Sequence, residues 1–344
     1  MAADCEFVGF ASGLRPLELG DLTGTLAYRA VPVPTRALYR IWSLLGAPKV
    51  DALLGGADVY HATNYFLPPT RSARRVVTIY DLSFLSMPEH SSPKITHVFA
   101  KGVRRFAQQA DAVLTCSQAT KSDVVRLLDV SADRVAVAYG AVDEACVALE
   151  RDAASERVAE RFGVRRPFIL FVSTIEPRKN VPALLRAFGR LAREIPHDLV
   201  LAGPKGWQAE AIFREIDALH LEDRVILTGF ITDRADLAAL YSAADLFAFP
   251  SLYEGFGLPV LEAMTCGCPV VTADNSSLPE VAGEAALLVD ARDVPAIASA
   301  MRRVLEDDAL RQAMVARGFA QATRFSWEAC ARRTLEVYKD LALG

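Results

Sequence analysis

The most informative segment of the chain is Ser251-Leu-Tyr-Glu-Gly-Phe-Gly-Leu-Pro-Val-Leu-Glu262. The apolar run before it, residues 246–250, has the continuous hydrophobicity of a buried parallel strand. Pro259 suits the first turn of a helix, and Gly267 with Pro269 ends that helix. The sequence therefore predicts a strand, a loop and a helix, with the loop at the strand's carboxyl end, where open α/β sheets bind ligands.

Two carboxylates, Glu254 and Glu262, lie eight residues apart in this stretch. Gly255 and Gly257 allow the backbone to approach a ligand, and the helix start favours a phosphate. Carboxylates do not bind phosphate but accept hydrogen bonds from the hydroxyls of a sugar or a ribose. Taken alone, the pair is explained as well by two solvated glutamates at a helix start.

Bulk composition restricts the class of protein. The chain has 344 residues, enough for two domains, and is 52% hydrophobic and 23% charged. Its formal charge of −4 argues against a nucleic-acid partner, and its longest apolar runs fall short of the ~20 residues that span a bilayer. The first residues lack the basic start of a signal peptide. Because the six cysteines and five histidines show no ligand spacing, we expect reduced thiols, a cytoplasmic location, and no metal or other cofactor.

Short apolar runs alternate with helical patterns along the chain, which is typical of parallel sheets joined by crossover helices. Residues 143–166 are polar and contain no predicted strand, so we place a domain boundary there. The predicted division is 1–145, 146–325 and a final helical segment, 326–344. The predicted strands are 5–10, 59–61, 76–79, 112–116, 135–137, 168–172, 199–202, 225–228, 246–249, 270–272 and 286–289.

A second group of polar residues follows the strand at 168–172. Arg178 and Lys179 lie in its exit loop, and a helix begins near Asn180. Adjacent arginine and lysine side chains near a helix start can neutralise a diphosphate, although a solvated basic turn has the same sequence. Both this loop and the one at Glu254 end strands of one domain, so we expect them to face the same cleft.

Two segments carry a family resemblance. Residues 254–270 read Glu-Gly-Phe-Gly-Leu-Pro-x-x-Glu-Ala-Met-x-x-Gly-x-Pro-Val, which resembles the donor-site signature of glycosyltransferase family 4, retaining enzymes of the GT-B fold. Residues 176–180, Glu-Pro-Arg-Lys-Asn, resemble the family's diphosphate-binding segment in the form associated with mannosyltransferases. The resemblance implies two facing Rossmann-like domains with parallel sheets.

The resemblance also implies residue roles. Arg178 and Lys179 would hold the donor diphosphate, Glu262 the ribose and Glu254 the transferred sugar. Backbone amides of the loop would contact the sugar and the phosphate. The loop residues are Gly255, Phe256, Gly257 and Leu258. Two further residues, Gly229 and Phe230, end another strand and either border the nucleotide base or form a simple turn.

The expected reaction needs no metal. Breaking a sugar–nucleotide bond leaves a diphosphate with growing negative charge, which cations and N–H donors placed in advance stabilise in the transition state. The departing phosphate can take the acceptor's proton, which fits the lack of an obvious base. Retention of configuration is implied by the resemblance alone. GDP-mannose is our first choice of donor, and a growing polysaccharide or a lipid-linked glycan is the expected acceptor.

The first half offers Asp81 as a carboxylate facing the acceptor or the sugar; a turn or helix-cap aspartate explains it as well. Many family members have His-Asp at this place, where this chain has Tyr80-Asp81. Two helices have basic faces: 35–45, with Thr35 as its cap, carries Arg36 and Arg40, and 93–109 carries Lys101, Arg104 and Arg105. Such faces are usual on surface helices; the alternative is contact with an anionic lipid-linked acceptor or the inner membrane surface.

The start of the chain departs from the family pattern. A GT-B first domain opens with a strand, a Gly-rich loop and a helix, whereas this chain begins at what resembles the second strand. We therefore expect a first domain without its opening βα unit: either the start is truncated or wrongly assigned, or the protein has lost part of its acceptor side. The resemblance also implies a last helix that returns to this domain. The rival function is a non-catalytic remnant that binds nucleotide sugars. An NAD-linked enzyme is excluded because no GxGxxG opens a βαβ unit.

Overall fold

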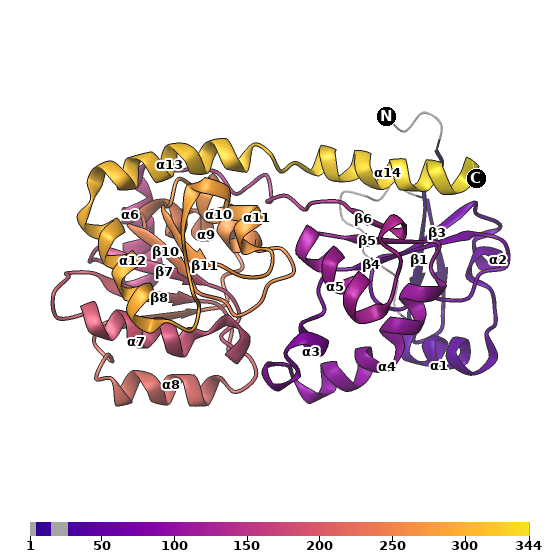
Figure 1. Ribbon diagram of the computed structural model, residues 1–344, viewed down its shortest axis with the longest axis horizontal. Coiled ribbons are helices and arrows are strands. Elements are labelled where there is room, and N and C mark those ends of the chain that lie inside the picture. The colour runs from indigo at the N-terminus through magenta and orange to yellow at the C-terminus, as the bar shows by residue number, and fades with distance from the viewer. Residues whose placement is uncertain (1–4, 15–26, 344) are drawn as a thin grey trace.

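The computed structural model describes residues 5–14 and 27–343, except for the side chains at 94, 95, 97, 98 and 101. The chain forms two bodies that lie side by side (Figure 1). Each contains a parallel sheet with helices packed on it, so the predicted fold class is confirmed. The predicted domain limits stay predictions.

The second body holds one six-stranded parallel sheet in the order β12-β11-β10-β7-β8-β9. This is the doubly wound order, in which the chain direction across the sheet reverses between the first strand, β7, and the fourth, β10. Every predicted strand of this half is present. The strands are β7 (Phe168–Val172), β8 (Asp198–Ala202), β9 (Val225–Gly229), β10 (Leu246–Phe249), β11 (Val270–Ala273) and β12 (Ala286–Val289).

Continuous apolar strands place this sheet between two helical layers. All four residues of β10 are buried, and Phe171 and Phe249 lie within its core. The loops after β7 and β10 lead into helices α7 and α10. The helices are α6 (Arg151–Phe162), α7 (Val181–Leu191), α8 (Ala209–Ala218), α9 (Arg234–Ala243), α10 (Leu258–Thr265), α11 (Leu278–Ala282), α12 (Val294–Glu306) and α13 (Asp308–Ala322).

In the first body the strands are divided between two sheets. A four-stranded parallel sheet has the order β3-β4-β5-β6, and β1 pairs only with β2 among the described residues. The strands are β1 (Val8–Ser12), β2 (Ala27–Val31), β3 (Val59–Ala62), β4 (Arg74–Ile79), β5 (Ala112–Thr115) and β6 (Val135–Val137). The helices are α1 (Thr35–Leu45), α2 (Val50–Leu54), α3 (Ser83–Ser86), α4 (Pro93–Gln109) and α5 (Gln118–Leu128).

A cavity of about 1400 Å³ separates the two sheets of the first body. Residues of both β1 and β3 line it, together with Trp42 and Tyr338. The described residues place no strand between β1 and β3, where a doubly wound sheet has its first strand. The predicted lack of an opening βα unit stays a prediction.

Two sequence-based details of this body were wrong. Strand β2 was not predicted, because its residues are mostly exposed and include Arg29. Thr35 is not a helix cap: Pro34 holds the cap position, and the Thr35 hydroxyl donates to the Ser12 carbonyl at 3.0 Å. The bounds of α1 and α4 are as predicted.

The last helix, α14 (Trp327–Leu343), crosses from the second body to the first (Figure 1). Ser326 caps it, its hydroxyl accepting from the Ala329 N–H at 3.1 Å. Val337 packs against a small cluster on the first body's sheet, and Tyr338 Oη lies 2.5 Å from His61 Nδ1. The helix therefore ties the two bodies together.

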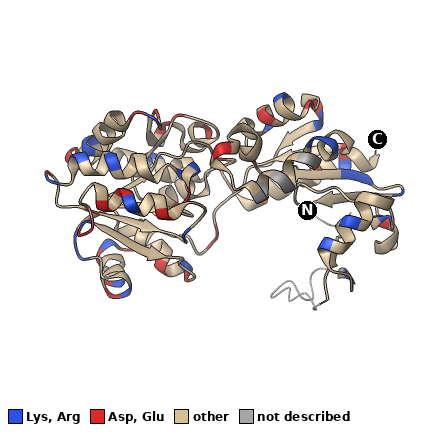
Figure 2. Ribbon diagram, turned by 90° about the horizontal axis from the view of Figure 1, so that it is seen from below, with Lys and Arg blue, Asp and Glu red and all other residues tan. Residues whose placement is uncertain are grey.

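Lysine and arginine positions alternate with aspartate and glutamate positions along the ribbon (Figure 2). Within the described part of the chain, no helix combines the length and the apolar character needed to cross a bilayer.

Candidate active site

The site lies where the strand order of the second body's six-stranded sheet reverses, between β7 and β10. Arg178 and Lys179 lie in a short 3-10 turn after β7, and Glu254 lies in the loop after β10. Because β7 and β10 are neighbours in the sheet, their exit loops meet. The sequence predicted that these loops face one cleft, and the structure brings their charged side chains into direct contact.

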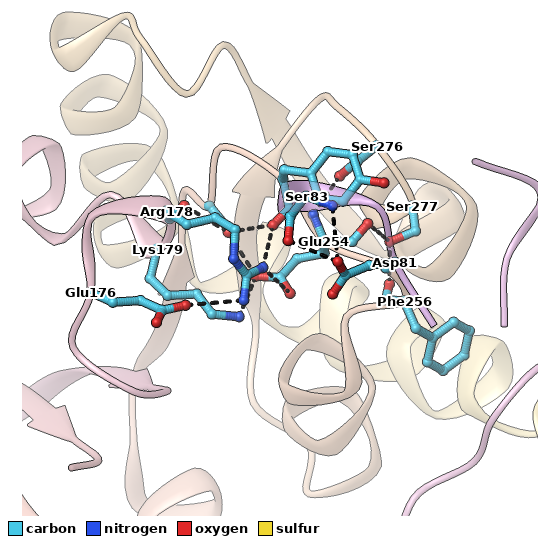
Figure 3. A network of polar contacts seen from close by, with 12 residues as sticks. Asp81, Ser83, Glu176, Arg178, Lys179, Glu254, Phe256, Ser276 and Ser277 are labelled. Atoms are coloured by element: carbon cyan, nitrogen blue, oxygen red, sulfur yellow. Dashed lines mark hydrogen bonds and ion pairs between the residues drawn. The ribbon is translucent and has the colours of Figure 1, made fainter. Parts of the chain in front are cut away.

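Three side chains converge on the Glu254 carboxylate (Figure 3). Lys179 Nζ lies 2.7 Å from Oε1, and Arg178 Nη1 lies 3.3 Å from Oε2. The Ser251 hydroxyl also donates to Oε1, at 2.7 Å. Arg178 makes two more contacts, with the Tyr253 carbonyl at 2.7 Å and with Glu176 at 3.1 Å. In this arrangement both cations have carboxylate partners.

Glu254 is a buried, charged carboxylate. Burial would raise its pKa, but Lys179 and Arg178 outweigh that effect and hold the pKa of Glu254 below its ordinary value. The carboxylate and carbonyl contacts of Arg178 likewise fix the guanidinium in one orientation. The cluster is therefore a rigid polar surface, a geometry suited to stabilising charge that develops on a bound molecule.

Glu262 does not join this cluster. It lies in α10, and its carboxylate accepts a hydrogen bond from Tyr241 Oη at 2.8 Å. Burial raises the pKa of Glu262, although the bond from Tyr241 opposes the shift. The backbone carbonyl of Glu262 contacts Cys146 in the segment between the two bodies. Of the two glutamates in the motif, the structure places only Glu254 beside Arg178 and Lys179.

The loop from Gly255 to Leu258 turns the chain into α10. Gly257 has a φ of 109° and stands at the N-terminal cap of the helix, as the predicted helix start requires. The Phe256 ring is directed away from the charged cluster and packs against Phe325 and Tyr139, at centroid distances of 5.6 and 6.2 Å (Figure 3). The side chain of Phe256 thus anchors the loop, and only its backbone is available to a ligand.

Gly255 serves a close approach between the two bodies. A Cβ atom at this position would lie 2.2 Å from the Tyr80 carbonyl oxygen, a distance no side chain tolerates. The Gly255 carbonyl accepts from Ser117 Oγ at 2.6 Å and Thr120 Oγ1 at 3.1 Å, both in the first body. The glycine was predicted to admit a ligand; the neighbour it admits in this structure is the first body's backbone.

Gly229 is the last residue of β9, the edge strand of the sheet, and Phe230 follows it. Gly229 has a φ of 71°, and the Phe230 side chain is 70% exposed. The carbonyl of Gly229 accepts from the Gly203 N–H at 2.9 Å, so the exits of β8 and β9 lie side by side. An exposed ring at this edge is available to a flat ligand, and the predicted role beside a base stays a prediction.

Asp81 faces the cluster from the first body. Its Oδ1 accepts from both the backbone N–H and the hydroxyl of Ser83, at 2.9 and 2.8 Å, which are the contacts of a turn aspartate. Its charge also acts on Arg178 across the cleft: burial would lower the pKa of Arg178, but Glu254 and Asp81 raise it. The structure therefore supports the turn interpretation and leaves a carboxylate edge near the cleft.

Several site residues were not singled out from the sequence. The Ser276 hydroxyl accepts from the Glu254 N–H at 2.9 Å, and the Ser277 hydroxyl donates to the carbonyls of Glu254 and Phe256. These serines follow β11, the strand next to β10. Polar residues directly after a buried strand were the signal that could have revealed them.

The two basic helix faces are only partly described. The side chains of Lys94, His97 and Lys101 in α4 lie outside the described residues. Arg104 donates to the Leu127 carbonyl at 2.6 Å, and Arg105 lies over the Phe106 ring. These two arginines of α4 thus have partners within the protein, whereas Arg36 and Arg40 of α1 are exposed. Membrane contact stays a prediction. No cluster of metal-ligand side chains occurs in the described part of the chain, and metal independence likewise stays a prediction.

The fold and the site define a two-domain α/β protein with an ionic site at the switch point of its second sheet. Residues 152–321 match the family model described as glycosyl transferases group 1, and residues 3–146 match that described as Glycosyltransferase Family 4. The O-antigen chain mannosyltransferase B of Escherichia coli is 36% identical over 286 residues, which cover 82% of this chain and 74% of that protein. The chain belongs to the family 4 (group 1) glycosyltransferases of the GT-B fold.

Two further likenesses agree with this assignment. The serotype-specific mannosyltransferase WbdA of Escherichia coli is 37% identical over 241 residues, covering 68% of this chain but only 29% of that protein. The sucrose-phosphate synthase of Thermosynechococcus elongatus has a TM-score of 0.76 at 23% identity, over 99% of this chain and 90% of its own. The predicted family is confirmed.

Proposed function

We propose that this protein transfers a hexose, with mannose as our first choice, from a nucleotide-diphosphate sugar to a glycan or lipid-linked acceptor, with retention and without a metal. The observation that carries the proposal is the contact of Arg178 and Lys179 with Glu254 at the switch point. Mannose is favoured because the curated relatives of this chain, at 36 and 37% identity, are mannosyltransferases. The matching process is the synthesis of a bacterial polysaccharide, and the matching location is the inner face of the membrane.

The chain's own residues can stabilise the departing nucleotide. As the sugar–phosphate bond breaks, negative charge grows on the diphosphate oxygens. Arg178 can offer the diphosphate the N–H donors that do not contact Glu254, and can exchange its outer partner, Glu176, for it. Lys179 adds a fixed positive charge behind the arginine. In the described contacts of this cluster, the first body adds no further cation. Arg178 and Lys179 therefore supply most of the stabilisation of the departing diphosphate.

Glu254 has a different role in this proposal. Its carboxylate oxygens accept hydrogen bonds from Lys179, Arg178 and Ser251. A carboxylate can accept about four, which leaves acceptor capacity for a sugar hydroxyl. Because its pKa is lowered, the carboxylate is ionised at neutral pH and acts as a hydrogen-bond acceptor rather than as a general acid. The departing phosphate takes the acceptor's proton. Glu262 in α10 accepts from the ribose and Asp81 faces the acceptor.

The alternative is a protein that binds nucleotide sugars without transferring them. The divided sheet and the cavity of about 1400 Å³ in the first body favour it, because the first body is expected to hold the acceptor. The two functions share the donor site and differ only in turnover.

The test has two arms. In the first, calorimetric titrations with GDP-, UDP-, dTDP- and ADP-sugars should give the tightest binding with GDP-mannose. In the second, labelled GDP-mannose, mixed lipid-linked and soluble glycans and a chelator should yield labelled product. Binding without transfer or hydrolysis would establish the non-catalytic alternative. Absence of binding to every nucleotide sugar would reject both functions.

A further inference from the structure

One carboxylate of the second body reaches into the first. Glu280, in the short helix α11, accepts from the Gln118 N–H at Oε2 and from the Ala119 N–H at Oε1, each at 3.0 Å. Gln118 and Ala119 are the first two residues of α5. The N–H groups of a helix's first turn have no partners within the helix, so they need acceptors from outside.

The α5 start is completed by residues from two bodies. Ser117, its own cap residue, accepts from the Thr120 N–H at 3.0 Å, and Glu280 satisfies the two N–H groups that Ser117 leaves. The Tyr139 hydroxyl donates to Oε2 of Glu280 at 3.1 Å. A carboxylate at this helix end also meets the positive end of the helix dipole. The bonds of Glu280 to Gln118 and Ala119 join the second body to the first.

The same turn of α5 holds the loop that carries Glu254. Ser117 and Thr120 donate to the Gly255 carbonyl, at 2.6 and 3.1 Å. Because Gly255 follows Glu254 directly, any movement of the α5 start displaces the loop of the candidate site. A short chain of contacts thus joins Glu280 to Glu254 through the first body.

We propose that Glu280 is a positioning residue for the transfer reaction, which holds the two bodies closed and keeps the Glu254 loop in place across the cleft. The inference rests on the proposed function, since the Glu254 loop is the part that would meet the donor sugar. Glu280 itself touches no atom of the charged cluster in the described contacts. Its contribution comes from anchoring the α5 start, to which Gly255 is bonded.

The test compares Glu280→Gln and Glu280→Ala with a matched control, Glu284→Gln. Glu284 is an exposed glutamate four residues further along the same segment. Each variant is measured for peptide-resolved amide exchange across 117–120 without ligand, for the melting temperature, for the affinity for GDP-mannose, and for kcat and KM of transfer.

The glutamine variant keeps the shape of the side chain but turns an amide N–H₂ toward at least one backbone donor. We expect exchange at 118 and 119 to become about tenfold faster and kcat to fall about tenfold, the loss typical of a charge-assisted hydrogen bond. Donor affinity and melting temperature should stay near those of the wild type, and Glu280→Ala should show the same pattern. Glu284→Gln should match the wild type in every measurement.

Two results would overturn the inference. Unchanged exchange and kcat in both Glu280 variants would show that the contact does not hold the bodies closed. A parallel loss of melting temperature and donor affinity would make Glu280 a merely structural residue. Amide exchange is measured without a nucleotide, so failure of the proposed function is distinguishable from failure of this inference. A wild type that binds no nucleotide sugar counts against the proposed function. Faster exchange in Glu280→Gln would still support the contact between the two bodies.

Discussion

The two bodies contribute differently to the cleft between them. The second body gathers charge at the reversal point of one continuous sheet, with Arg178, Lys179 and Glu254 in mutual contact. The first body, whose strands are divided between two sheets, holds the loop after Glu254 with neutral donors, Ser117 and Thr120, which bond to the Gly255 carbonyl. In the proposed function, the second body would bind the charged donor and the first body would position the loop that carries Glu254.

The strongest test of this comparison is Arg178→Ala. If the second body supplies the stabilising charge, kcat should fall by about 10²- to 10³-fold, as when one preorganised donor is removed from an active site. Donor affinity should change far less, because Lys179 remains. Steady-state kinetics with GDP-mannose would measure the effect. The control is Arg186→Ala, which removes an exposed arginine from α7; equal activity of the two variants would contradict the account.

Glu254→Gln tests whether the charged cluster is held together by its carboxylate. Replacing one partner of a buried ion pair leaves Lys179 uncompensated, so unfolding at pH 7 should require about 3 kcal/mol less than in the wild type. The pKa of Glu254 lies below its ordinary 4.5, so this stabilisation is present above pH 4.5 and is lost as the pH falls through the lowered value. Denaturant titrations from pH 7 to pH 3 should show the difference shrinking.

Glu262→Gln is the matched comparison for that titration. Burial raises the pKa of Glu262, so its contribution to stability is present below pH 4.5 and is lost as the pH rises through the raised value. The free energy of unfolding of the glutamine variant should therefore rise relative to that of the wild type as the pH rises. If both variants followed the same pH trend, the two glutamates would not differ in environment as the structure indicates.

Gly255→Ala probes the contribution of the first body, and we expect a smaller effect. The added Cβ would meet the Tyr80 carbonyl at 2.2 Å, so closure should be impaired and kcat should fall about tenfold, the cost of roughly one interbody hydrogen bond. Donor affinity should be retained, because the clash lies between the bodies. The control is Gly189→Ala in α7, where a Cβ meets only ordinary contacts. Full activity in Gly255→Ala would show that closure is not needed.

Much of the second body could be predicted because its strands are continuous apolar runs and its site residues follow them directly. The meeting of Arg178 with Glu254 needed only the rule that parallel strands end at one edge. The same rule does not predict the direction of the Glu262 side chain. Its position in α10 turns the carboxylate toward Tyr241 instead of the cluster. Strand β2 was missed because an exposed strand has no apolar pattern.

The contacts between the bodies could not be predicted at all. Glu280 and Gln118 are 162 residues apart, and their contact depends on how two separately packed bodies are oriented. No local pattern of residues encodes that orientation. The tight approach of Gly255 to Tyr80 has the same origin, so a glycine expected to admit a ligand proved to admit the neighbouring body.

We place the diphosphate of a nucleotide sugar at the exit loops of β7 and β10. A crystal structure of the protein with GDP is the decisive experiment. We expect diphosphate oxygens within hydrogen-bond distance of the Arg178 guanidinium and near Lys179, with the base toward Phe230. A nucleotide bound elsewhere, for example in the cavity between β1 and β3, with Arg178 still paired to Glu176, would rule this placement out.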